Sequence, residues 1–212
     1  MSKLPVGYER ETLAACGLLL LQAPDTDTLQ ALDLNAANLE EYRQAFYDRL
    51  CIPQSGIYLP AYQQVFRNAS QDQDGVWHFP PPDYRGGRGV EMMYEQFGFE
   101  HHGLPVDPFF QGPQVPGDHL GLMLIFLGWV WDAPREDPVA GKKLSLFVGK
   151  FLGDWVDRYL VLLPAGQSSP YLDAIARSLG EAIDAVRESP VLTQDFGGVV
   201  HSDQSQAIAD TV

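Results

Sequence analysis

Apolar residues recur every three or four positions along most of this chain, which is the spacing of an amphipathic helix. The pattern predicts helices over residues 8–22, 38–50, 59–68, 90–97, 118–131, 142–163 and 170–187. Residues 118–131 are apolar almost all round, and this segment is therefore expected to be a buried central helix. No stretch shows sustained alternation with the period of two that is typical of strands. We therefore predict an all-α fold, a single globular helical bundle.

Proline and glycine interrupt the helical pattern at two long stretches. Residues 68–89 are expected to form a loop, and residues 100–117 are expected to form a hinge between two helical lobes. We predict one helical domain over residues 1–190 and a C-terminal tail over residues 191–212 that frays. A hinge of this length permits domain swapping, so the expected state is a monomer or a domain-swapped homodimer.

The charge of the chain restricts its partners. The 212 residues include 28 acidic and 14 basic side chains, a net charge of −14 at pH 7. This balance argues against binding nucleic acid, which needs cations to displace counterions from phosphate, and it attracts a cationic partner. The longest uncharged apolar run, Leu120 to Trp131, is shorter than the roughly 20 residues that span a bilayer. With only two cysteines, no disulfide framework is expected, and we predict a cytoplasmic protein without a membrane span.

Signatures of catalysis are missing from the sequence. There is no nucleophile elbow, no phosphate-binding loop and no His-Glu-x-x-His pair, and we predict neither an enzyme nor a cofactor. His101 and His102 are adjacent and would point about 100° apart on a helix, so they are interpreted as a surface pair. Asp118 beside His119 suggests a general base, but no nucleophile accompanies them. The residues alone favour Asp118 as a helix N-cap.

The Asp-His pair belongs to a longer motif. Pro116, Asp118 and His119 precede the long apolar helix in a pattern that resembles the signature of the TorD/DmsD/NarJ family, chaperones for molybdenum-containing redox enzymes. That family has Glu-Pro-x-Asp-His before such a helix. Here Val115 stands in the place of the glutamate.

Other segments carry the same resemblance in the same order. Pro60, Tyr62 and Phe66 match the family's Pro-x-aromatic-x-Ser-x-aromatic segment, with Gln64 in the place of the serine. Further matches occur at Tyr94, Gly98 and Phe99, and at Phe151, Leu152 and Trp155. The resemblance extends over roughly residues 8–187.

The resemblance implies a TorD-like chaperone. Such a protein binds the twin-arginine signal peptide, or another N-terminal region, of the precursor of a molybdopterin-containing oxidoreductase, and holds it until the cofactor is inserted and before export or assembly. The residues that the resemblance assigns to peptide binding are Pro60, Tyr62, Phe66, Pro116, Asp118 and His119.

Each of these side chains has a chemistry that suits such a peptide. Asp118 would pair with an arginine, His119 would donate a hydrogen bond or stack, and Tyr62 and Phe66 would line an apolar groove with an acidic rim. We expect this groove near residues 58–66 and 114–120. Packing in the core remains an equal alternative for Tyr62 and Phe66.

Two other functions remain open. One is a helical assembly factor that reads a segment of a mature partner protein. The other is a small metal-binding helical enzyme that uses His101, His102, Asp118 and His119, which would require the hinge to fold back.

Overall fold

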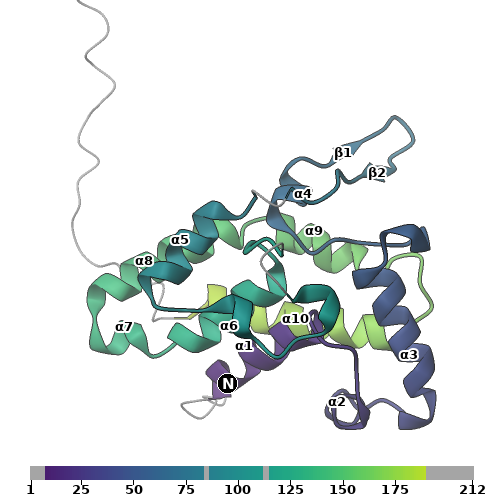
Figure 1. Cartoon of the computed structure of the whole chain (residues 1–212), viewed down its shortest axis with the longest axis horizontal. Coiled ribbons are helices and arrows are strands. Elements are labelled where there is room, and N and C mark those ends of the chain that lie inside the picture. The colour runs from purple at the N-terminus through teal and green to yellow at the C-terminus, as the bar shows by residue number, and fades with distance from the viewer. Residues whose placement is uncertain (1–7, 84–85, 112–114, 190–212) are drawn as a thin grey trace, which may run out of the picture.

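The computed structural model describes residues 8–83, 86–111 and 115–189, and helices dominate this part of the chain (Figure 1). Its α-helices are α1 (Tyr8–Leu19), α2 (Thr26–Ala31), α3 (Leu39–Phe46), α4 (Gln63–Arg67), α5 (Arg88–Gln96), α6 (Leu120–Val130), α7 (Ala133–Glu136), α8 (Pro138–Phe151), α9 (Trp155–Leu162) and α10 (Pro170–Arg187). Shorter 3₁₀ or π segments cover Ala36–Asn38, Tyr47–Cys51, Pro53–Ser55, His101–Gly103 and Pro108–Phe110. The predicted all-α character is confirmed. The tail over residues 191–212 lies outside the described residues.

A short antiparallel hairpin is inserted between α4 and α5. Its strands are β1 (Ser70–Gln71) and β2 (Trp77–His78). The turn is organised by Asp72, whose carboxylate accepts hydrogen bonds from the backbone N–H groups of Asp74 and Val76, at 3.0 and 2.9 Å. These side-chain bonds add to the backbone bonds of the same turn, which join the Gly75 N–H to the Asp72 carbonyl oxygen and the Asp72 N–H to the Val76 carbonyl oxygen. The hairpin lies within the segment that the sequence predicts to be a loop.

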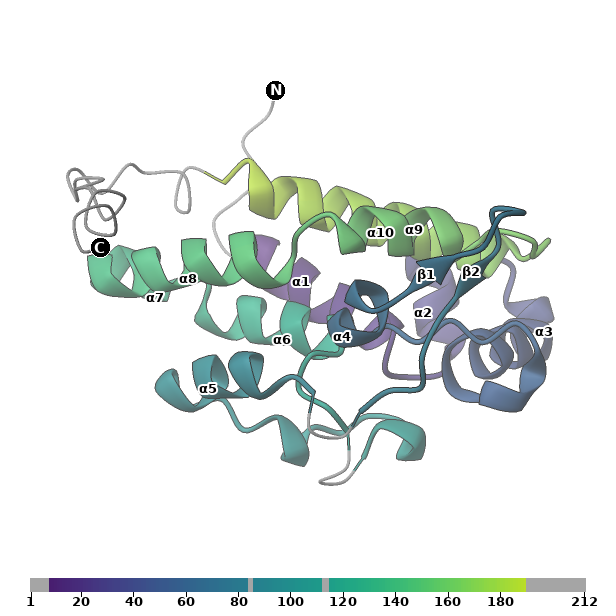
Figure 2. The same ribbon diagram turned by 90° about the horizontal axis from the view of Figure 1, so that it is seen from above.

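Helix α6 is the centre of the fold, as its apolar sequence predicts. Its residues are buried except for Ile125, which is half-buried, and Trp129, which is exposed. Phe126 contacts Tyr94 of α5 and Phe147 of α8, with ring centroids 4.8 and 4.9 Å apart. On another side α6 packs along α1, and α10 lies along α1 in turn (Figure 2). None of the described helices is both long and apolar enough to cross a membrane.

Glycines allow α1 and α6 to approach each other backbone to backbone. A Cβ atom at Gly17 would lie 2.5 Å from the carbonyl oxygen of Gly121, and a Cβ atom at Gly121 would lie 2.7 Å from the carbonyl oxygen of Gly17. Gly128 meets the carbonyl oxygen of Arg10 in the same way, at 2.7 Å. No larger side chain fits at these points without a shift of the helices. The close packing of α1 against α6 therefore depends on these three glycines.

Residues on both sides of the predicted hinge contribute to one continuous core. Leu20 and Phe46 from the first half pack in the same buried cluster as Leu124 and Ile175 from the second half. Helices α1 and α10, from opposite ends of the chain, contact each other directly. The predicted hinge at 100–117 and the division into two lobes stay predictions.

The helix predicted over residues 142–163 is two helices. Helix α8 ends at Phe151 and α9 begins at Trp155, with Gly153 in the break. The indole Nε1 of Trp155 donates a hydrogen bond of 2.7 Å to the carbonyl oxygen of Phe151 and satisfies one of the free carbonyls at the end of α8. Glycine weakens a helix interior by about 1 kcal/mol relative to alanine, which favours a break at this point.

Candidate functional site

The structure brings together the two segments that carry the sequence motif. Tyr62 and His119 form an isolated antiparallel bridge. The backbone N–H of Leu120 donates to the carbonyl oxygen of Ala61 at 2.8 Å. The residues assigned to peptide binding are all buried: Pro60, Tyr62, Phe66, Pro116, Asp118 and His119. They form a corner between α4 and α6, and we call it the Asp-His corner.

Asp118 caps α4 and not its own helix. Its side chain is 1 % exposed, and its Oδ2 accepts the backbone N–H of Gln64 at 2.8 Å. The amide Nε2 of Gln64 donates to Oδ1 at 3.2 Å. Burial raises the pKa of this carboxyl group, while the bonds from Gln64 oppose the rise. The sequence interpretation of Asp118 as the N-cap of the following helix is wrong, because the carboxylate satisfies the start of a helix 54 residues earlier.

His119 is the residue that caps α6. Its Nδ1 accepts the backbone N–H of Gly121 at 3.1 Å, and its side chain is 2 % exposed. Rings surround it, with the Tyr62 centroid at 4.9 Å and the Phe110 centroid at 5.1 Å. Burial lowers the pKa of His119 to about 3, so the imidazole is neutral at pH 7.

Phe66 packs in the core beside the Asp-His corner. Its ring centroid lies 5.5 Å from that of Trp155 and 5.6 Å from that of Tyr159. With Asp118 and His119 bonded internally, the Asp-His corner has an architectural role in this conformation. A peptide-binding role for its six residues stays a prediction that requires the Asp-His corner to open.

Stability is expected to fall below neutral pH because of His119. The pKa of His119 is near 6.5 in the unfolded chain and about 3 in the folded protein. The unfolded state therefore binds more protons between these two pH values. The contribution of His119 to the free energy of unfolding is therefore complete above pH 6.5. It falls by up to ~1.4 kcal/mol for each pH unit between 6.5 and about 3. His101, whose pKa burial lowers to about 4, acts in the same direction. Asp118, with its raised pKa, acts in the opposite direction.

Urea titrations at pH 7.0, 6.0 and 5.0 measure this dependence. The control is His119→Asn, since asparagine can also cap a helix but does not titrate. The variant should show a weaker fall in stability between pH 7 and 5 than the natural protein. Parallel pH profiles for the two proteins would remove His119 as the cause.

The adjacent histidines are not among the residues of the Asp-His corner. The rings of His101 and His102 are 3.9 Å apart, and the Nε2 atom of His101 is buried without a hydrogen-bond partner. Among the residues that the structure describes, no group of three His, Cys, Asp or Glu side chains is placed to hold a metal ion. The structure thus does not bring His101 and His102 together with Asp118 and His119.

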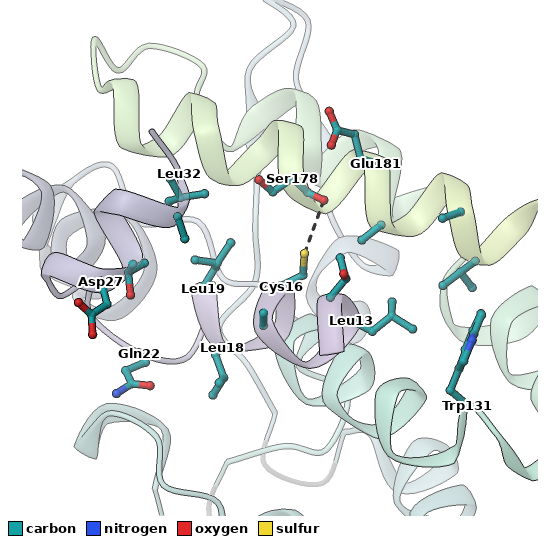
Figure 3. Close-up of a pocket in the computed structure, with 17 residues that line it drawn as sticks. Leu13, Cys16, Leu18, Leu19, Gln22, Asp27, Leu32, Trp131, Ser178 and Glu181 are labelled. Carbon is teal, nitrogen blue, oxygen red and sulfur yellow. Dashed lines mark hydrogen bonds between the residues drawn. The ribbon is translucent and has the colours of Figure 1, made fainter. Parts of the chain in front are cut away.

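An open apolar groove lies elsewhere, between α1, α2 and α10 (Figure 3). It has a volume of about 680 Å³, within the range of about 300–1,000 Å³ typical of ligand sites. Apolar side chains form most of its wall: Leu13, Ala15, Leu18, Leu19, Ala31, Leu32, Trp131, Ala182, Ala185 and Val186. We call this feature the α1–α10 groove.

Two carboxylates stand on the rim of the α1–α10 groove, Asp27 on α2 and Glu181 on α10, and both are exposed. No lysine or arginine is among the described residues that line it. Between α1 and α10, the Cys16 thiol donates to the carbonyl oxygen of Ser178 at 3.6 Å (Figure 3), and burial raises its pKa to about 11. The thiol is therefore protonated and serves packing, so the groove offers apolar contact and negative charge.

A weak signal for this groove is present in the sequence. The predicted core stripe of the first helix includes Leu13 and Cys16, whereas Leu18 and Leu19 fall beside it. Leu18 and Leu19 remain half-buried in the structure and line the groove. Adjacent apolar side chains outside the core stripe indicate a second contact surface where they belong to one contiguous patch.

The described part of the chain is a helical fold with an apolar groove that has two exposed carboxylates on its rim. Comparison with known proteins assigns no family: no family model matches the chain, and neither a curated protein nor a solved structure matches it.

Proposed function

We propose that this protein is a chaperone that binds a leader peptide, in which arginines precede an apolar stretch, in the α1–α10 groove. The observation that carries the proposal is the combination of an apolar wall with two exposed carboxylates on its rim. The client is the precursor of a molybdenum-containing oxidoreductase, held in the cytoplasm until cofactor insertion.

The wall of the groove suits the apolar part of such a peptide. An amphipathic or apolar helix binds by laying its apolar face into a groove between helices. Leu18, Leu19 and Leu32 are only half-buried, so they have apolar surface left to lose on binding. Burial of apolar surface contributes roughly 25 cal/mol per Å².

The rim and the overall charge suit the arginines. Asp27 and Glu181 can each accept paired hydrogen bonds from a guanidinium group. The net charge of −14 steers a cationic segment toward the protein and raises its association rate at low salt. The same field disfavours anionic competitors.

The sequence resemblance to the TorD/DmsD/NarJ chaperones supports the choice of client. It rests on the segments around Pro60 and Pro116 and on the aromatic residues of the later helices. These segments form the Asp-His corner in this chain. We therefore separate the two features: the Asp-His corner holds the fold, and the α1–α10 groove binds the peptide.

A peptide titration tests the proposal. A synthetic peptide with two consecutive arginines followed by an apolar stretch should bind saturably at low salt, and calorimetry should show weaker binding as salt increases. The double variant Asp27→Asn/Glu181→Gln should bind about tenfold more weakly, because two rim charges of ~0.2–1 kcal/mol each are removed.

The control carries the same change of charge outside the groove. Asp184→Asn/Glu188→Gln alters two exposed carboxylates of the same region that do not line it. Its affinity should stay near that of the natural protein. Equal weakening by both double variants, or no binding of any arginine-bearing leader, contradicts the proposal. Binding only to a folded partner without its leader would favour the alternative of an assembly factor.

A further inference from the structure

A second cleft lies on another part of the molecule, between the β1–β2 hairpin and the junction of α8 and α9. Its volume is about 670 Å³. Three cationic side chains line it: Arg67 at the end of α4, Lys150 at the end of α8 and Arg158 on α9. We call it the hairpin cleft. In contrast to the α1–α10 groove, its lining is mainly polar and basic.

This concentration of positive charge is unusual for the chain. There are 14 basic side chains in total against 28 acidic ones, yet three converge on one cleft. Asp154 is the carboxylate among the described lining residues. Nearby carboxylates are engaged elsewhere: Asp72 lies 2.8 Å from His78, and Asp157 pairs with Arg187 at 2.7 Å. The cleft thus keeps a positive charge inside a strongly negative protein.

The three cations have no acidic partner within the part of the chain that the structure describes. Arg67 donates to the carbonyl oxygen of Lys150 at 2.7 Å. Cations near helix C-termini also balance the helix dipole, which accounts for part of the placement of Arg67 and Lys150. It does not account for Arg158, which lies in the middle of α9.

Arg158 is held over an aromatic ring. Its guanidinium carbon lies 4.4 Å from the centroid of Trp77 on β2, and Arg158 itself is half-buried. Trp155, at the start of α9, lines the same cleft. Asp154 makes no side-chain hydrogen bond to the first turn of α9, so the amide groups there are not capped by it. Cations, a flat indole and a helix start without a side-chain cap therefore lie around one space.

We propose that the hairpin cleft binds a small ligand that carries a phosphate-type dianion next to a planar ring. Arg67, Lys150 and Arg158 would neutralise and hydrogen-bond the dianion, since guanidinium groups match phosphate oxygens in pairs. Because Arg158 covers one face of Trp77 and Phe79 is stacked with the indole, the ring would contact the edge of Trp77. The inference does not depend on the proposed chaperone function, because the α1–α10 groove shares no residue with this cleft.

Calorimetric titration of the full chain with inorganic phosphate and with phenyl phosphate, at low salt, tests this site. Both are expected to bind at one site, with phenyl phosphate the tighter of the two because it adds the ring contact. Tighter binding of inorganic phosphate would place the free ion, and not a ring-bearing ligand, in the cleft and would overturn the proposal. Lys150→Gln and Arg158→Gln should each weaken phenyl phosphate binding about tenfold, the loss expected for a charge-assisted hydrogen bond.

Two controls keep the result decisive. Arg43→Gln removes an arginine of α3 that pairs with Glu40 and does not line the cleft, and it should leave phenyl phosphate binding unchanged. Lys150 is exposed, so its substitution does not threaten the fold even if Arg158→Gln loosens the hairpin. The absence of saturable binding, or equal affinities of Lys150→Gln and Arg43→Gln, would overturn the proposal.

Discussion

Replacement of Gly121 by leucine is expected to lower the free energy of unfolding by about 3 kcal/mol or more, the largest effect of any single change considered. A Cβ atom at this position would lie 2.7 Å from both the carbonyl oxygen of Gly17 and the Cγ atom of Leu21. The first of these atoms belongs to the backbone of α1, which cannot move away without separating from α6. Urea denaturation followed by circular dichroism measures the effect.

The matched control is the same substitution at Gly149 of α8. A Cβ atom there meets no other atom within 4 Å, and the residue is exposed. Leucine is the better helix former by somewhat less than ~1 kcal/mol, so Gly149→Leu should be neutral or slightly stabilising. Similar denaturation midpoints for the two variants would show that the close approach of α1 and α6 does not hold the fold.

Exchange of Ala15 for tryptophan is expected to abolish binding of an arginine-bearing leader peptide. Ala15 is exposed and lines the α1–α10 groove, so the largest of the natural side chains would occupy space that the peptide needs. The loss should exceed about a hundredfold in affinity, which corresponds to ~2.7 kcal/mol. The fold should survive, because the cost is limited to the weaker helix propensity of tryptophan, a few tenths of a kcal/mol.

Ala165→Trp provides the comparison for this variant. Ala165 is also exposed but lies in the turn after α9, outside the groove. The two tryptophan variants should unfold at similar urea concentrations while only the first loses the peptide. Retention of full affinity by Ala15→Trp would place the peptide elsewhere on the molecule.

Helix positions could be predicted where the apolar stripe faces one core. The helix predicted over residues 170–187 has the bounds of α10, because its stripe of Leu172, Ile175, Leu179 and Ile183 packs on a single surface. The apolar stripe over residues 142–163 continues across the point where α8 ends and α9 begins. Both α8 and α9 face the same core there, so periodicity alone does not reveal that the helix ends at Phe151.

The Asp-His corner shows what local patterns omit. Asp118 precedes a helix and has the side chain of an N-cap, yet it bonds Gln64, and His119 caps α6 instead. Whether Asp118 or His119 caps α6 depends on the contact of Asp118 with Gln64, 54 residues away. Patterns of neighbouring residues do not contain this contact. Gln64, which stands where the resembling family has serine, is the residue that bonds to Asp118.

The α1–α10 groove could not be located from the sequence for a related reason. The charge and the resemblance predict an apolar groove with an acidic rim near residues 58–66 and 114–120. None of the described residues in these two ranges lines the α1–α10 groove, whose walls come from α1, α2 and α10. Gly17 and Gly121 set the distance between α1 and α6, and α1 carries one wall of the groove. A glycine in the apolar stripe of a helix indicates a close approach to another backbone, but it does not identify which helix approaches.

Backbone amide chemical shifts of the isotope-labelled protein, recorded during titration with the arginine-bearing leader peptide, test the central claim most directly. We predict that the largest changes occur at α1, α2 and α10, around Ala15, Leu19, Asp27 and Glu181, with the Asp-His corner little affected. Changes confined to residues 58–66 and 115–120, with α1 and α10 unaltered, would contradict a peptide site in the α1–α10 groove.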